Sequence, residues 1–196
     1  MSSRLLGTLV LALAVPIVSP SSIAIASCGS NWDWSGGFGT FIHVYSSNGS
    51  MSPGIIDDAI SAWDNACGMT AAGRGFPAMS RSNAAFGIQV DVVYHNGRGN
   101  NCGLTHPRLR PGAPFRVEIW KKSRIAGGGP EYFCDRDDSL AHELGHVLGL
   151  GDCGSFDGPL MNTADTYWQN GNEYAAERGI TASECQHADD RFVTRF

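Results

Sequence analysis

The sequence is poor in charge and in long apolar segments. Only 17% of its 196 residues are charged, and 14 Lys and Arg stand against 19 Asp and Glu, a formal net charge of −5. Coiled coils and highly charged disordered chains need far more charge. No basic run is interleaved with aromatic residues, so we expect no nucleic-acid partner. With 25 glycines, no internal repeat and no linker, the chain is expected to form one loop-rich domain.

The apolar run at residues 5–18 is too short to cross a bilayer. It spans about 14 residues, whereas a membrane helix needs about 20. The run follows Arg4 and leads into small residues that end at Ala26, which is the pattern of a secretory signal peptide with an A-x-A cleavage site. We therefore expect a signal peptide over residues 1–26, no stable membrane insertion, and a secreted mature domain over residues 27–196.

The even number of cysteines agrees with export. Six cysteines in an oxidising compartment predict up to three disulfides, in one of fifteen connectivities among which the sequence does not choose. They are Cys28, Cys67, Cys102, Cys134, Cys153 and Cys185. Alternatively, residues 25–28 are a lipoprotein cleavage box, so that Cys28 is lipidated and the protein is anchored to a membrane surface. Because this alternative leaves an odd number of cysteines, we favour a free extracellular domain and expect it to be a monomer.

Apolar alternation and turn residues predict the first elements. Strands are expected over residues 40–45, 86–94 and 115–119, with a connection rich in Gly, Asn and Pro over residues 95–114. Between the first two strands, Ser52 can cap a helix, Pro53 suits its first turn, and Gly68 can end it in the left-handed conformation. These boundaries are all set by local residue types.

Two further helices are expected near the C-terminus. The first begins at Asp138 or Ser139, either of which can cap it, and runs to Leu148. The last begins at Thr181, where Glu184 completes a capping box. Strands early in the chain and helices late predict an α+β domain.

The first of these two helices carries two histidines four residues apart. Residues at this spacing differ by about 40° in azimuth, so His142 and His146 project from one face and can bind one metal ion. Glu143 lies at the edge of this face, where it can contact a water molecule on the metal. Gly149 can take a positive φ and turn the chain so that Asp152 reaches the ion. Two imidazoles and one carboxylate leave a tetrahedral position open, which is typical of catalytic zinc.

The segment His142 to Asp152 resembles the extended motif of the metzincin zinc endopeptidases, HExxHxxGxx followed by His or Asp. The Asp form is typical of snapalysin-like members. Met161, nine residues after Asp152, matches the methionine of the family's Met-turn. The resemblance covers most of residues 40–196. It implies a single metzincin-like domain with a twisted mixed sheet, a zinc-binding active-site helix and a C-terminal helix.

The resemblance also implies the chemistry. It makes His142, His146 and Asp152 the ligands of Zn²⁺, makes Glu143 the general base of peptide hydrolysis, and makes proteins or peptides the substrates. An extended substrate would pair with an edge strand, for which the segments 88–94 and 115–120 are the candidates. Some members carry a metal-binding Tyr two residues after the methionine, where this chain has Thr163.

Several alternatives remain open at the level of sequence. Residues 172–177 loosely resemble the helix in which gluzincins carry their third ligand, which would assign that role to Glu173. A catalytically silent secreted module that keeps zinc only for its fold is the alternative to an enzyme, and the intact Glu143 argues against it. The acidic residues before the zinc helix could hint at calcium, but we interpret them as caps and helix-dipole partners. They are Asp135, Asp137 and Asp138.

Overall fold

The computed structural model describes residues 41–68, 78–83, 87–109, 112–124, 131–152, 160–161, 166–169, 172–175 and 179–193. The expected signal peptide, Cys28, Cys153 and Thr163 lie outside these ranges. None of the helices in the described ranges is long and apolar enough to cross a membrane.

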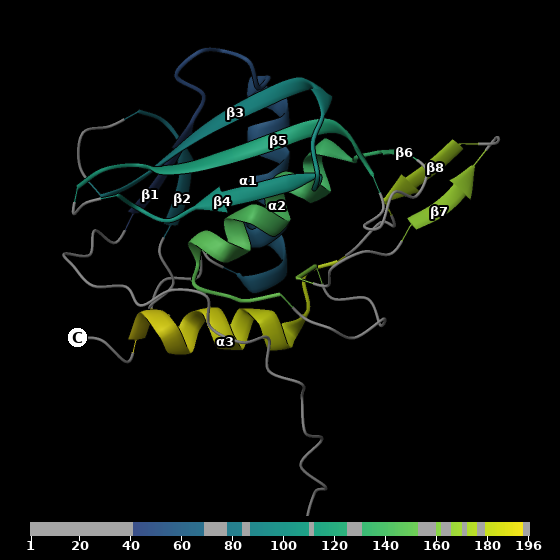
Figure 1. The fold of residues 1–196 in the computed structure, drawn as a ribbon. Coiled ribbons are helices and arrows are strands. Elements are labelled where there is room, and N and C mark those ends of the chain that lie inside the picture. The colour runs from purple at the N-terminus through teal and green to yellow at the C-terminus, as the bar shows by residue number, and fades with distance from the viewer. Residues whose placement is uncertain are drawn as a thin grey trace, which may run out of the picture.

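The described strands form one twisted mixed sheet (Figure 1). They are β1 (Phe41–Tyr45), β2 (Ala78–Arg81), β3 (Ile88–Arg98), β4 (Gly103–His106), β5 (Phe115–Arg124), β6 (Glu131–Phe133), β7 (Thr166–Gln169) and β8 (Asn172–Ala175). Their order is β2-β1-β3-β5-β6-β8-β7, and β4 also pairs with β5. Strands β2, β1, β3 and β5 are mutually parallel, whereas β4 and β6 run antiparallel to β5. The predicted α+β class is confirmed.

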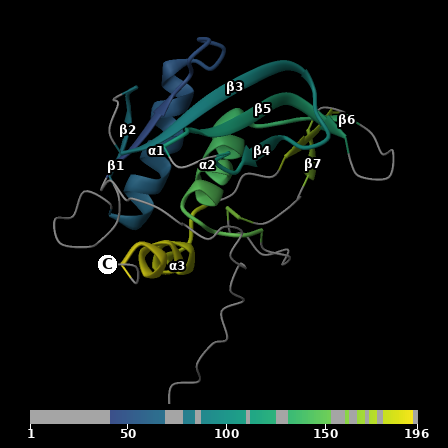
Figure 2. The ribbon, with the colours of Figure 1, turned by 60° about the vertical axis from the view of Figure 1, so that its left-hand side comes forward.

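Three helices complete the described fold: α1 (Pro53–Cys67), α2 (Arg136–Val147) and α3 (Ala182–Val193). Helices α1 and α2 lie side by side against one face of the sheet, and α3 lies beyond them (Figures 1 and 2). The fully buried Trp63 of α1 donates its indole N–H to the Ala141 carbonyl of α2 at 2.8 Å. This bond fixes α2 against α1 one residue before the first predicted metal ligand.

Helix α1 confirms the boundaries expected from its local residues. Ser52 is the N-cap and accepts the Ile55 amide, Pro53 opens the first turn, and Gly68 closes the helix at a φ of 62°. The buried side of the helix is apolar, and its members are Ile56, Ala59, Ile60 and Trp63.

Helix α2 begins earlier than expected. Its N-cap is Asp135, whose carboxylate accepts the amides of Asp137 and Asp138 at 2.9 and 3.2 Å. The predicted start at Asp138 or Ser139 was therefore wrong. Three of the four residues 135–138 are aspartates, and each could cap a helix. Local residue type does not decide which of them is the N-cap. Asp135 is a cap, as the interpretation of this acidic cluster proposed.

The free edge beside α2 belongs to a strand that the sequence analysis missed. Strand β4 lies within the predicted 95–114 connection and pairs only with β5 among the described residues. The two predicted edge segments are both interior, because β3 lies between β1 and β5, and β5 is paired along both of its sides. Alternation shows which face of a strand is buried but not which strand ends a sheet.

Candidate metal centre

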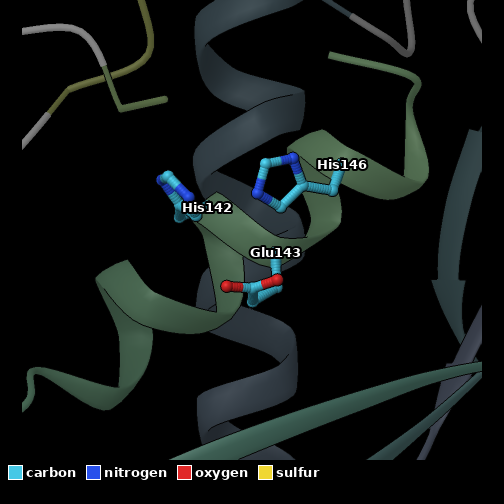
Figure 3. A group of neighbouring side chains, drawn as sticks. All are labelled: His142, Glu143 and His146. Carbon is cyan, nitrogen blue, oxygen red and sulfur yellow. The ribbon is translucent and has the colours of Figure 1, made fainter. Parts of the chain in front are cut away.

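Helix α2 presents two imidazole rings side by side (Figure 3). The rings of His142 and His146 have centroids 4.9 Å apart and are perpendicular to each other. Each can offer one ligand atom that, together with a carboxylate oxygen of Glu143, forms a group whose members all lie within 4.8 Å of one another. Among the described residues, α2 therefore carries a candidate metal-binding group, as its i, i+4 histidines predicted.

Backbone carbonyls orient both rings. His142 Nδ1 lies 2.7 Å from the Leu160 carbonyl oxygen, and His146 Nδ1 lies 2.9 Å from that of Leu150. A carbonyl can only accept, so each Nδ1 carries a proton and donates it. Each Nε2 then faces Asp152. It can offer a lone pair to a metal when it is deprotonated, which is the usual arrangement of metal-binding histidines, and it can donate to the Asp152 carboxylate when it is protonated.

Asp152 completes the geometry. Gly149 takes a φ of 87°, as predicted for the turn that ends the helix. Beyond it, Asp152 Oδ1 lies 3.2 Å from His142 Nε2 and 3.3 Å from His146 Nε2. Ligand atoms about 2.0–2.1 Å from a tetrahedral ion are separated by about 3.3–3.4 Å. The two distances from Asp152 match this spacing, and the ligand atoms of the two histidines lie within 4.8 Å of each other. Two imidazoles and a carboxylate are a donor set that fits zinc.

The electrostatics of the three groups are coupled. Burial alone would raise the pKa of the Asp152 carboxyl, but hydrogen bonds from both imidazoles and their charge hold this pKa well below its ordinary value. Burial would lower the pKa of His146, yet the hydrogen bond to Asp152 and the nearby Glu143 charge leave it raised. The site thus favours positive charge between the rings and the carboxylate, whether a proton or a metal ion supplies it.

Glu143 is held on another side of the helix. Its side chain is buried, and the Thr105 hydroxyl of β4 donates to its Oε2 at 2.6 Å. The carboxylate lies on the β4 side of α2, and one of its oxygens is within 4.8 Å of a ring nitrogen of each histidine (Figure 3). Glu143 is therefore close to both histidines, but its carboxylate is hydrogen-bonded to β4 and not to the two imidazoles and Asp152.

Met161 packs against helix α2 at Gly145. It is fully buried, and a Cβ built on Gly145, between the two histidines in sequence, would collide with its sulfur. The Met161 amide donates to Glu184 Oε1 at 2.7 Å. Because Leu160, which precedes it, accepts the His142 proton, Glu184 fixes the segment that orients a predicted ligand.

Glu184 makes two kinds of hydrogen bond, one within the capping box at Thr181 and one to Met161, and the sequence predicted only the first. The predicted capping box is confirmed, since Glu184 Oε2 accepts the Thr181 amide at 2.7 Å and the Glu184 amide donates to Thr181 Oγ1 at 3.2 Å. The bond to Met161 spans 23 positions and has no local signal. Sequence reasoning missed this bond, the two carbonyl anchors and the Thr105 contact.

The structure describes the other expected residues as follows. Residues 172–175, which the gluzincin alternative expects in a helix, form strand β8. Between described residues two of the expected disulfides are present, Cys67–Cys185 and Cys102–Cys134.

Comparisons with known proteins find similarity among solved structures. No protein-family model matches the chain, and no curated protein matches it. Among solved structures, the fold is similar to metalloproteinase-II from Bacteroides fragilis, with a TM-score of 0.42 and 13% sequence identity. The match covers 78% of this chain and 52% of that one, so the chain spans about half the length of that protein. The local geometry of the site is what supports the function proposed below.

Proposed function

We propose that this protein is a secreted zinc-dependent endopeptidase of the metzincin class, with His142, His146 and Asp152 as metal ligands and Glu143 as general base. The observation that carries the proposal is the triangle of Nε2, Nε2 and Oδ1 atoms, with Asp152 Oδ1 at 3.2 and 3.3 Å from the two nitrogens. Both imidazoles have their Nδ1 protons directed to carbonyls, so both Nε2 atoms are oriented for one ion.

The donor set supports a catalytic role over a structural one. Three protein ligands leave one of four tetrahedral positions open, and structural zinc sites are closed by four. Zinc bound in such a site supplies Lewis acidity, which activates water as a nucleophile and polarises a carbonyl group. A buried carboxylate beside the open position has no use in a purely structural site. Glu143 therefore argues against the silent binding module.

Glu143 performs the proton transfers in this proposal. Its carboxylate accepts a proton from the attacking water and passes it to the amine that leaves when the peptide bond breaks. Burial of the side chain keeps the carboxylate away from bulk water, and the Thr105 hydroxyl limits its orientations. Proton transfer by a positioned carboxylate is thus the step that depends on Glu143.

The substrate in this proposal is an extended protein or peptide segment. Strand β4 contacts α2 and has an edge that no described strand pairs with. Such an edge can bind a peptide backbone through main-chain hydrogen bonds, which tolerates many side chains. Strand β4 replaces the interior segments 88–94 and 115–120 as the proposed docking strand.

Export remains part of the proposal. A signal peptide over residues 1–26 would deliver the mature domain, residues 27–196, to an oxidising compartment. The two disulfides in the described residues support this, because disulfides are rare in reducing compartments.

The direct test is metal-dependent proteolysis by the purified mature protein. Casein hydrolysis is measured for three states of the protein: the protein as purified, the protein after removal of metal with 1,10-phenanthroline, and the same protein after zinc is restored. We expect activity in the first and third states only, and loss of activity in Glu143→Ala. Sustained hydrolysis by metal-free protein, or by Glu143→Ala at the wild-type rate, would refute the proposal.

A further inference from the structure

The contact between β4 and Glu143 is more specific than edge-strand packing requires. Thr105 is 5% exposed, and its hydroxyl lies 2.6 Å from Glu143 Oε2 and 3.1 Å from the Glu143 carbonyl oxygen. The proton donor is a side chain and the acceptor is the proposed general base. Hydrogen bonds to an ionised acceptor are about twice as strong as neutral ones.

Gly103 forms the other half of this contact. Residues two apart on a strand point to the same face, so position 103 faces α2 as Thr105 does. A Cβ built on Gly103 would overlap the Glu143 carboxylate and its Cγ. The Glu143 side chain thus fits against β4 because Gly103 has no side chain, and it accepts a hydrogen bond from the Thr105 hydroxyl.

A disulfide holds this arrangement in register. Cys102, directly before β4, is bonded to Cys134, which directly precedes the N-cap of α2. Both half-cystines are also bound to neighbouring residues of β5, since the Trp120 amide donates to the Cys102 carbonyl and the Cys134 amide to that of Lys121. The start of β4 and the start of α2 are therefore tied to one point of the sheet.

We propose that Thr105 is a positioning residue for Glu143. This inference rests on the proposed function and deepens it. A glutamate side chain has three rotatable torsions, and proton transfer needs one orientation of its carboxylate. The Thr105 hydroxyl occupies one oxygen and holds that orientation, which leaves the second oxygen to exchange the proton. The imidazoles are held elsewhere, so the hydroxyl serves proton transfer and not metal binding.

Thr105→Val is the informative variant because it keeps the β-branched shape and replaces the hydroxyl with a methyl group, which cannot donate a hydrogen bond. We expect kcat to fall about tenfold or more, with KM changed by less than about twofold. Zinc content and the visible spectrum of the cobalt-substituted protein are expected to stay as in the wild type. Thr105→Ser should keep kcat within about threefold of the wild type, because it restores the donor.

Two further variants keep the test decisive. Ser123→Ala removes a fully buried hydroxyl from β5 and serves as the matched control, which should retain wild-type kcat. If Thr105→Val fails to fold, as judged by its thermal melt, Thr105→Ala replaces it, with the same expectation. A Thr105→Val protein with wild-type kcat, or one that loses zinc together with activity, would overturn the proposal.

A structural measurement separates this proposal from the proposed function. In crystals of the wild type and of Thr105→Ser, Glu143 should occupy one rotamer, and in Thr105→Val it should occupy more than one. A wild-type protein that hydrolyses nothing would refute the peptidase, yet these rotamers would still decide whether Thr105 orients Glu143. A single unchanged rotamer in Thr105→Val would overturn the positioning role.

Discussion

The two sides of helix α2 are supported by different parts of the chain. The imidazoles donate to the carbonyls of Leu150 and Leu160, which both follow the helix. Glu143 instead accepts a hydrogen bond from Thr105, on a strand that precedes the helix. Residues one position apart in sequence thus depend on separate structural elements, so metal binding and proton transfer should respond to different substitutions.

The chemical nature of the two supports also differs. On the side of α2 that carries the two imidazoles, called the metal side below, the hydrogen-bond partners are main-chain carbonyls. No substitution removes a main-chain carbonyl, and it moves only when the backbone moves. On the side that carries Glu143, called the carboxylate side below, the partner is the side-chain hydroxyl of Thr105, which a single substitution removes. Substitutions near Glu143 should therefore change a rate constant, whereas those near the carbonyl anchors should change metal affinity and stability.

The largest expected effect comes from the metal side. His146→Ala leaves two of the three proposed ligands, so bound zinc should fall from about one ion per chain to a level below detection, and hydrolysis should be lost. Elemental analysis of dialysed protein checks this. His187→Ala, a histidine loss on α3, is the control and should keep full zinc. Full zinc occupancy in His146→Ala would show that His146 is not a ligand and that zinc binds at other residues.

The third ligand is the next largest effect. Asp152→Ala should weaken zinc binding by about 100-fold or more, because it removes the carboxylate that lies 3.2 and 3.3 Å from the two Nε2 atoms. Glu173→Ala should bind zinc as the wild type does. Competition with a chelator of known affinity measures both. If Glu173→Ala alone lost the metal, the assignment of Asp152 would be wrong.

Glu184 tests whether the carbonyl anchors matter. In Glu184→Gln an amide replaces one of two oxygens that accept the Met161 and Thr181 amides, so one amide would face a donor. We expect zinc affinity to fall about tenfold, with a smaller change in kcat of the zinc-loaded protein. A folded Glu184→Gln with unchanged affinity would remove Glu184 from the metal side.

The pH dependence of stability gives a smaller effect. The pKa of His146 is raised above its ordinary 6.5, so its protonation stabilises the metal-free fold fully below that pH, and this stability is lost as pH rises through the folded pKa. The pKa of Asp152 is lowered from 3.8, so its contribution is present above 3.8 and is lost only in stronger acid. The pair should stabilise metal-free protein most between about pH 4 and 6.5.

Melting temperatures check this window. Zinc needs neutral imidazoles, so the increase in Tm on adding zinc should be larger at pH 8 than at pH 6. Asp152→Asn removes the hydrogen bond to the Asp152 carboxylate and its charge, two of the causes that raise the pKa of His146, and should therefore weaken the pH dependence of Tm in metal-free protein. If the increase in Tm on adding zinc were smaller at pH 8 than at pH 6, zinc and protons would not compete for the two imidazoles beside Asp152.

The sequence predicted elements whose signals are local. Ser52, Pro53 and Gly68 act within one or two turns of α1, so its boundaries could be read directly. The i, i+4 histidines and the positive φ of Gly149 follow from helix geometry and from the glycine backbone. The capping box at Thr181 is of the same kind, because donor and acceptor are three residues apart.

The features that the sequence did not predict depend on distant pairings. Strand β4 has four residues, and its pairing with β5 is what makes it a strand. The hydrogen bonds from Thr105 to Glu143 and from Met161 to Glu184 span 38 and 23 positions. Such contacts appear only when the sheet and helices are assembled. Periodicity and capping rules cannot locate them.

Parallel assay of wild type and Glu143→Gln, each loaded with zinc and each analysed for bound metal, tests the central claim most directly. The amide keeps the size of the side chain but cannot accept the proton. We predict equal zinc content and hydrolysis of casein slower by about 10²-fold or more in the variant. Equal rates at equal zinc content would contradict the assignment of Glu143 and, with it, the separation of the two sides of α2.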